Sequence, residues 1–185
     1  MRIIAGKFKG RKIETVHDYS IRPTTDRAKT IIFNVLSNYV NFENLEILDL
    51  FAGCGSLGLE AISRGARKVT FVDSSRKSIN VLQKNIALLG CQDRCFVHQA
   101  DVFWFLKNVK KLFDIVFVDP PYKLENIGKL PDIIYDSKTL HNGSYVVLEH
   151  HYRSAIKTDL SRYDVTRKAC GQTNILIMKS IVPPK

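Results

Sequence analysis

The stretch Asp49-Leu50-Phe51-Ala52-Gly53-Cys54-Gly55-Ser56-Leu57-Gly58 decides the fold class of this chain. It follows a short apolar run, residues 45–48, and leads into a helical pattern of apolar residues over 59–62. A buried strand, a glycine-rich turn and a helix, in this order, form the first half of a βαβ unit. Such units build parallel sheets that are covered by helices on both faces.

The three glycines of this turn have the spacing G-x-G-x-x-G, which is typical of dinucleotide sites. There a pyrophosphate lies on the helix N-terminus, and an acidic residue about 20 positions later binds the ribose, as Asp73 could here. However, Asp49 already puts a carboxylate at the strand end, which repels a pyrophosphate and attracts the ammonium group of a methionine moiety. S-adenosylmethionine is therefore favoured, with Gly53 and Gly55 admitting it to the backbone and Asp73 accepting from its ribose hydroxyls. A glycine-rich turn without a ligand is the alternative.

A second motif, Asp119-Pro120-Pro121-Tyr122, ends the apolar run of residues 113–118. Prolines lack the N–H donor that a strand needs, so the ladder must stop here and leave backbone carbonyls free to accept. The Asp119 carboxylate and the Pro120 carbonyl can each accept one N–H of an exocyclic amino group on a nucleobase, while Tyr122 stacks on the ring. The alternative is a proline-rich turn with an ordinary solvent-facing aspartate.

Together these motifs resemble class I methyltransferases of exocyclic amino groups, and the whole chain resembles the RsmD family of bacterial 16S ribosomal RNA guanine-N2 methyltransferases. The segments that carry the second resemblance are residues 2–12, 22–27, 49–61, 63–66, 119–122 and 171–173. The resemblance implies a seven-stranded sheet, S-adenosylmethionine as cofactor, and ribosomal RNA in the assembled or assembling small subunit as partner. Two departures are Asp73, where a glutamate is common, and Cys170, where an aromatic residue is frequent.

These interpretations define three groups of candidate residues. The catalytic group is Asp119, Pro120, Pro121 and Tyr122. The cofactor-binding group is Asp49, Phe51, Gly53, Gly55, Asp73 and Asp101, where Asp101 would accept from the adenine amino group or cap the following helix. The group expected to bind RNA is Arg2, Lys7, Arg11, Arg22, Thr24 and Arg27. The roles of Glu149 and of residues 171–173 are left open.

Charge supports a polyanionic partner. The 185 residues carry a net charge of +10, and residues 1–30 hold eight basic and three acidic side chains, a net +5. Half of the excess thus lies in a sixth of the chain, which favours a nucleic-acid-binding extension over lysines that only serve solubility. We expect one domain of residues 1–185, in which 1–42 form an RNA-binding extension of hairpin and helix and 43–185 form the catalytic core.

Other features of the sequence indicate the cellular location, the metal content and the oligomeric state to expect. No apolar run reaches the roughly 18 residues of a membrane span, and no signal peptide is evident, so a cytoplasmic protein without membrane contact is expected. The four cysteines and five histidines show no spacing typical of a metal site, and no metal is expected. A monomer is expected.

The pattern of apolar residues predicts alternating strands and helices. Expected strands are 45–50, 68–73, 94–98, 113–118, 144–149, 161–167 and 173–180, after a hairpin at 2–16. Expected helices run from Thr24 or Thr25 to about Val40 and over 56–64, 75–89, 101–110 and 126–138. This predicts an α/β fold, Rossmann-like, with helices on both faces of a mainly parallel sheet and an antiparallel strand pair at one edge.

Three other functions stay open at this point. The amino-group clamp would also fit adenine or cytosine in DNA or another RNA. The chain could instead be an inactive RNA-binding module or a dinucleotide dehydrogenase. The intact set Asp49, Gly53, Gly55, Asp73 and Asp119 argues against the inactive module, and Asp49 together with the motif of residues 119–122 argues against the dehydrogenase.

Overall fold

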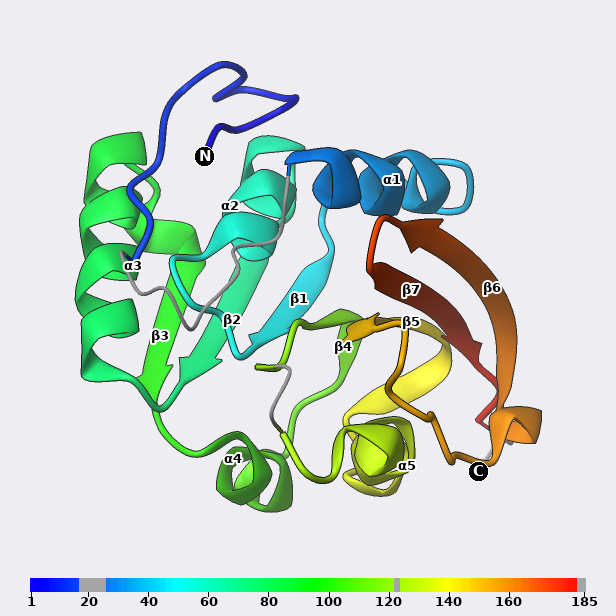
Figure 1. The fold of residues 1–185 in the computed structure, drawn as a ribbon. Coiled ribbons are helices and arrows are strands. Elements are labelled where there is room, and N and C mark those ends of the chain that lie inside the picture. The colour runs from blue at the N-terminus through cyan, green and yellow to red at the C-terminus, as the bar shows by residue number, and fades with distance from the viewer. Residues whose placement is uncertain (17–25, 122–123, 183–185) are drawn as a thin grey trace.

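The computed structural model describes residues 1–16, 26–121 and 124–182 and shows a seven-stranded sheet with the order β3-β2-β1-β4-β5-β7-β6 (Figure 1). Strands β1 to β5 are parallel, and β7 runs antiparallel to both β5 and β6. The strands are β1 Glu46–Leu50, β2 Lys68–Asp73, β3 Cys95–Gln99, β4 Phe113–Val118, β5 Leu140–His151, β6 Tyr163–Cys170 and β7 Thr173–Ser180. The predicted Rossmann-like class I methyltransferase fold is confirmed.

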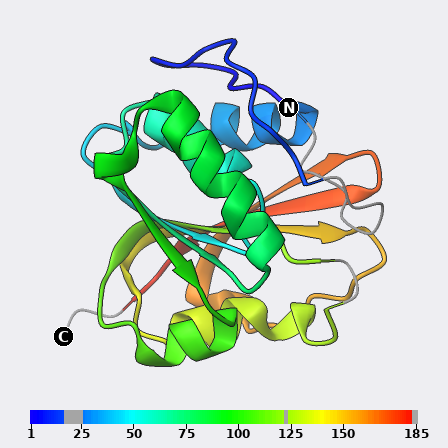
Figure 2. The same ribbon diagram turned by 90° about the vertical axis from the view of Figure 1, so that its left-hand side faces the viewer.

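Helices cover both faces of this sheet (Figures 1 and 2). They are α1 Asp26–Leu36, α2 Ser56–Ser63, α3 Arg76–Leu89, α4 Val102–Asn108 and α5 Leu130–Asp136, with 3-10 turns η1 Gln92–Arg94, η2 Ile127–Lys129 and η3 Leu160–Arg162. Helices α1, α2 and α3 bury their apolar sides with Ile47 and Phe117, whereas α4 and α5 pack with Leu48 and Val116. Successive strand residues thus pack into the cores on opposite faces of the sheet, as strand alternation requires.

Some element boundaries differ from the sequence prediction. The helix expected to reach Val40 ends at Leu36, and its expected start lies outside the described residues. The helix expected over 126–138 is a 3-10 turn followed by a short α5, because Pro131 has no N–H and is tolerated only in the first turn. Strand β5 is longer than expected because it pairs with β4 from Leu140 and with β7 up to His151.

The N-terminal segment forms the predicted hairpin only in outline. A single bridge joins Arg2 and Lys12, supported by hydrogen bonds from the N–H of Ile3 to the Arg11 carbonyl and from the N–H of Ile13 to the Met1 carbonyl, both 3.0 Å. Ile3 and Ile13 lie in the same buried cluster as α1, α2 and α3. The segment is therefore packed on the core, and its treatment as a separate extension, residues 1–42, is a proposal about function.

Two features are absent from the described part of the chain. None of its helices combines the length and apolarity needed to cross a membrane. Among the same residues, no three His, Cys, Asp or Glu side chains come together as a metal site would require.

Candidate functional site

Three carboxylates come together at the carboxyl edge of the parallel strands. Asp49 lies in β1, Asp73 ends β2, and Asp119 follows β4 directly. The residues two positions before each of them, which by strand alternation point to the same face, are Ile47, Phe71 and Phe117. All three belong to the core cluster under α1, α2 and α3, so the carboxylates share that face of the sheet. Carboxyl edges of open α/β sheets are where such folds bind ligands.

Asp49 lies deepest in this group. Its residue surface is 2 % exposed, and its Oδ2 accepts a hydrogen bond of 2.9 Å from the N–H of Gly58. Burial raises the pKa of Asp49 well above its usual value, and the neighbouring carboxylates of Asp119 and Asp73 raise it further. The structure thus gives Asp49 a role in fixing α2, and a contact with the cofactor stays a prediction.

Asp73 ties the glycine turn to the next βα unit. One carboxylate oxygen accepts from the N–H of Gly53 and the other from the N–H of Ser75, each at 2.8 Å. The Ser75 hydroxyl in turn caps α3 by accepting from Ser78. Each carboxylate oxygen has a further lone pair, so Asp73 can also accept from a ligand in the turn.

The glycines of the turn serve different needs. A Cβ on Gly55 would lie 2.4 Å from Leu82 Cδ1, and one on Gly58 would lie 2.3 Å from the Phe71 ring, so both positions are closed by packing. At Gly53, with φ +56°, the nearest atom to such a Cβ is the Phe51 carbonyl oxygen at 4.0 Å. The backbone at Gly53 is therefore the part of the turn that a ligand can approach. Phe51 itself has φ +56°, an uncommon conformation for a non-glycine residue.

Asp101 lies at the same edge beyond β3, whose last residue Gln99 pairs with Asp73. Its Oδ1 accepts from the N–H of Trp104 at 2.9 Å, which is the N-cap of α4. The capping role weighed from the sequence is therefore present, and the carboxylate is exposed. Its proposed contact with adenine is not tested by this arrangement.

The second motif stands where β4 stops. Asp119 is partly buried, Pro120 is buried, and the Pro121 carbonyl accepts from the N–H of Leu124 at 2.9 Å. The register of β4 with β5, which pairs Val118 with Leu148, brings Asp119 next to the buried Glu149. The predicted stacking residue Tyr122 lies outside the described residues.

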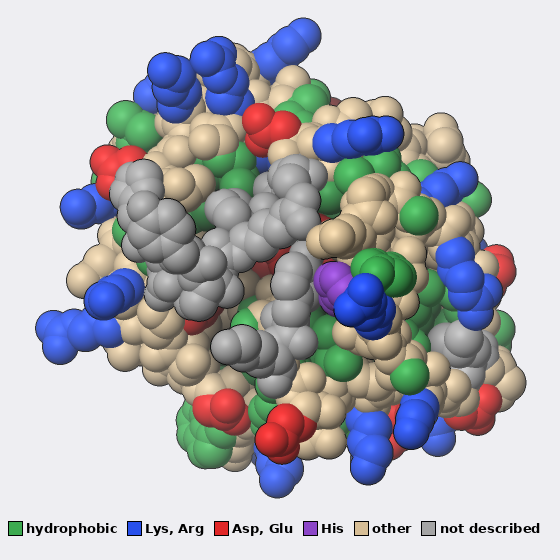
Figure 3. All heavy atoms as spheres, viewed as in Figure 1, with side chains coloured by type: hydrophobic (Ala, Val, Ile, Leu, Met, Phe, Trp, Pro, Cys, Tyr) green, Lys and Arg blue, Asp and Glu red, His purple; other side chains and the backbone are tan. Residues whose placement is uncertain are grey.

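The predicted RNA-binding residues lie apart from the carboxylates. Arg2, Lys7 and Arg11 are exposed in the N-terminal segment, and Arg27 is exposed on α1. Lys and Arg side chains gather over the top of the molecule in Figure 3, where Figure 1 places this segment. The Arg11 guanidinium also donates to the Leu88 carbonyl at 2.8 Å. Arg22 and Thr24 lie outside the described residues.

Several buried polar residues that fasten this segment were not singled out from the sequence. The Glu60 carboxylate accepts from the N–H groups of Ile4 at 2.7 Å and Ala5 at 3.0 Å, and it pairs with Arg64 at 2.8 Å. Lys29, counted above with the basic excess, is buried and donates to the Arg2 carbonyl, so it is not part of a basic surface. Burial lowers its pKa, which the Glu60 carboxylate partly opposes.

Asn85 joins the segment to the glycine turn. It is completely buried on α3, accepts from the N–H of Glu14 at 2.8 Å, and donates to the carbonyls of Glu14 at 2.9 Å and Cys54 at 3.0 Å. A polar residue between Leu82 and Ile86 in the apolar stripe of a helix is the signal by which the sequence could have shown it.

The comparisons with known proteins agree with this geometry. The family model described as conserved hypothetical protein 95, which is the RsmD family, matches residues 1–179. The chain belongs to this family. The resemblance found from the motifs is thereby confirmed, and the carboxylate edge lies entirely within the matched residues.

Individual members show how close the relation is. Ribosomal RNA small subunit methyltransferase D of Haemophilus influenzae is 37% identical over 152 residues, which are 80% of this chain and 78% of that protein. Its counterpart of the same name in Escherichia coli K12 is 32% identical over 173 residues, 93% of this chain and 86% of that protein. A solved structure of a hypothetical protein of Thermus thermophilus matches with a TM-score of 0.82 at 26% identity, covering 96% of this chain and 98% of that one.

Proposed function

We propose that the protein transfers a methyl group from S-adenosylmethionine to the exocyclic N2 amino group of a specific guanine in 16S ribosomal RNA, in the assembled or assembling small ribosomal subunit. The observation that carries this proposal is the placement of Asp49, Asp73 and Asp119 on one face of the carboxyl edge, with the open backbone of Gly53 beside them. Curated members of the family that are named ribosomal RNA small subunit methyltransferases support the RNA substrate.

The chemistry of this edge suits S-adenosylmethionine. The cofactor carries an ammonium group and a sulfonium centre, and it supplies an electrophilic methyl group when bound. The charged groups that act on Asp49 from its surroundings are the carboxylates of Asp119 and Asp73, so this edge favours a cationic ligand. Asp73 and Asp101 would hold the ribose and the adenine, and Gly53 would admit the ligand to the backbone.

The residues of the second motif would position the guanine. An exocyclic amine is a weak nucleophile because its lone pair is shared with the ring, so orientation is the main contribution that a protein can make. Asp119 and the Pro120 carbonyl would each accept one N–H of this amine and direct its lone pair, and Tyr122 would stack on the base. Asp119 would take the proton that the amine loses.

The N-terminal extension would bind the RNA backbone. Its exposed basic residues, Arg2, Lys7 and Arg11, belong to a segment that Asn85 connects to the glycine turn, so an RNA held there would lie on the same rigid body as the cofactor site. Arg22, Thr24 and Arg27 would add further contacts with the RNA.

The experiment that tests this function is direct. The protein is incubated with S-adenosylmethionine labelled in the methyl group and with naked 16S RNA, partly assembled small subunits or DNA, and the methylated nucleoside is identified after digestion. We expect N2-methylguanosine, with the RNA or subunit substrate. A methylated adenine or cytosine would replace the guanine assignment, and absence of transfer with S-adenosylhomocysteine still bound would favour the RNA-binding module.

A further inference from the structure

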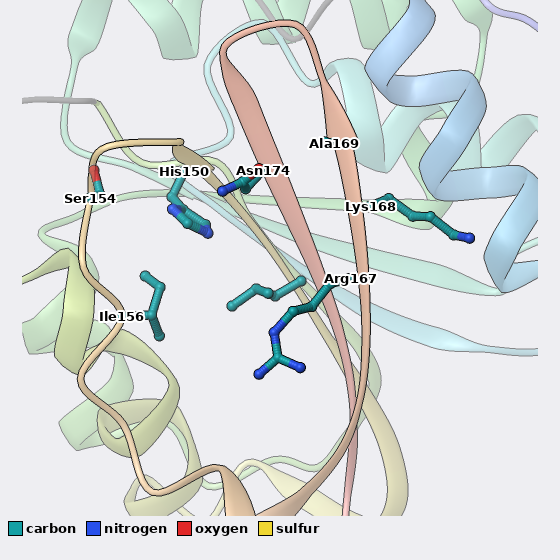
Figure 4. A pocket seen from close by; sticks show the side chains of 8 residues that line it. His150, Ser154, Ile156, Arg167, Lys168, Ala169 and Asn174 are labelled. Carbon is teal, nitrogen blue, oxygen red and sulfur yellow. The ribbon is translucent and has the colours of Figure 1, made fainter.

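A pocket lies on the face of the sheet that α4 and α5 cover, opposite the face of the carboxylates. It has a volume of about 380 Å³ and lies between β5, the β6–β7 pair and the loop of residues 152–158. His150, Arg167 and Asn174 approach it from the strands, and Ser154 and Ile156 belong to the loop (Figure 4). Leu176 of β7 also lines it. The size falls within the range of about 300–1,000 Å³ that is usual for ligand pockets.

The lining includes two basic residues, Arg167 and Lys168, and several hydrogen-bonding groups but no carboxylate. The Nδ1 atom of His150 lies 3.0 Å from the His151 carbonyl and must donate to it, which leaves Nε2 as an acceptor. Burial lowers the pKa of His150, so this neutral form persists at neutral pH. In the described part of the chain, no hydrogen bond or ion pair engages the guanidinium of Arg167 or the amide of Asn174.

The pocket is connected to the catalytic edge through both of its walls. His150 follows Glu149, which the β4–β5 register places beside Asp119. The loop wall is fixed to the segment after the second motif, because the N–H of Lys157 donates to the Gly128 carbonyl at 3.1 Å. Packing there is close, since a Cβ on Gly128 would lie 2.5 Å from the Ala155 carbonyl oxygen. For an RNA strand bound at the catalytic edge, the route to this pocket would pass the end of β5.

We propose that this pocket binds one unpaired nucleotide of the substrate RNA, adjacent in the strand to the nucleotide that is methylated. The proposal rests on the proposed function and extends it to the choice of target. Arg167 contacts the phosphate, His150 and Asn174 contact polar atoms of the base, and the base lies between Ile156 and Leu176. Single-stranded RNA is read in this way, by base edges and by apolar or aromatic surfaces on unstacked bases.

The combination of groups favours a nucleotide over a simple anion or an apolar ligand. A phosphate or sulfate alone would leave the acceptor Nε2 of His150 and the apolar walls without a counterpart. An apolar ligand would bury the Arg167 guanidinium and the Asn174 amide without partners, which is costly. A nucleotide combines a phosphate for Arg167, a polar base edge for His150 and Asn174, and a flat apolar face for the apolar walls.

The test uses the full chain and the RNA or subunit preparation that the wild-type protein methylates. Arg167→Gln should weaken RNA binding about tenfold, the loss of one charge-assisted hydrogen bond, whereas Arg167→Lys should retain most of the affinity. The matched control is Lys179→Gln, which removes one positive charge from the neighbouring strand β7. Lys179 is exposed and does not line the pocket, so this variant should bind RNA within about twofold of wild type.

A second variant tests occupancy without a change of charge. Ser154→Phe places a ring in the pocket from the loop and should also weaken RNA binding, while affinity for S-adenosylhomocysteine stays unchanged in every variant. RNA carrying 4-thiouridine next to the target should crosslink to residues 150–158 or 163–170. If Arg167→Gln and Ser154→Phe bind and methylate RNA like Lys179→Gln, or if the crosslinks map elsewhere, the pocket assignment is overturned. A wild-type protein that methylates no RNA would instead overturn the proposed function.

Discussion

Buried carboxylates in two regions of the molecule have opposite electrostatic surroundings. Glu60, under the N-terminal segment, is completely buried, pairs with Arg64 and accepts two backbone N–H groups. At the carboxyl edge, Asp49 is almost as deeply buried, but the charges around it are the carboxylates of Asp73 and Asp119. In the described residues no ion pair involves Asp49 or Asp73.

The difference separates a structural site from a functional one. A buried charge with a cation and hydrogen-bond donors is satisfied within the protein, and removing it costs stability. Carboxylates that lie close together raise one another's electrostatic energy, which a cationic ligand can lower. We therefore expect changes at Glu60 to affect folding and changes at the carboxyl edge to affect ligand binding and turnover.

The largest effect is expected at Asp119. Asp119→Ala removes the proposed acceptor of the amine, so single-turnover methylation should fall about 10²–10⁴-fold with little change in cofactor affinity. Asp93→Ala, at an exposed position of η1, is the control and should behave like wild type. Near-normal single-turnover rates for Asp119→Ala would exclude the clamp.

Glu60→Ala should act on stability instead. The change leaves Arg64 and the N–H groups of Ile4 and Ala5 without their acceptor, and we expect a loss of about 3 kcal/mol in the free energy of unfolding. Glu43→Ala, an exposed glutamate, should cost little. Urea denaturation measures both. If Glu60→Ala were as stable as Glu43→Ala, the contrast between the two groups of carboxylates would be wrong.

Asp73→Ala tests the cofactor side of the comparison. Loss of the proposed ribose contacts and of the hydrogen bond to Gly53 should weaken binding of S-adenosylhomocysteine by about 1–3 kcal/mol. Isothermal titration calorimetry measures this affinity, and RNA binding should be unaffected. NAD should not compete with S-adenosylhomocysteine for the wild-type protein. Competition by NAD would indicate that the glycine turn is a dinucleotide site.

The smallest effect is expected from the exposed charges of the N-terminal segment. Arg2→Gln with Lys7→Gln should weaken RNA binding severalfold and flatten the plot of log affinity against log salt by about 0.7–0.9 per lost contact. The matched double variant is Lys107→Gln with Lys110→Gln, at exposed positions in and after α4. An unchanged salt slope in the first variant would show that the basic excess is only a solvated surface.

Local pattern was enough to predict most of the chain. The strand, glycine turn and helix around Gly53 follow from apolar periodicity and from the backbone freedom of glycine, and both are properties of neighbouring residues. The same holds for β4, whose end is fixed by the prolines that follow it. The helix around Pro131 was predicted too long, because the pattern of apolar residues extends beyond the ends of α5, Leu130–Asp136.

The sequence by itself therefore determined the fold class, the family and the carboxylates of the carboxyl edge, because each is marked by residue types at short spacing. Only the tertiary structure decided the insertion of β7 between β5 and β6, the burial of Asp49, and the different reasons for glycine at Gly53 and Gly55. It also decided the functions of Glu60 and Asn85 in fastening the N-terminal segment. These depend on contacts between residues far apart in the chain, such as Ile4 with Glu60, which no local pattern specifies.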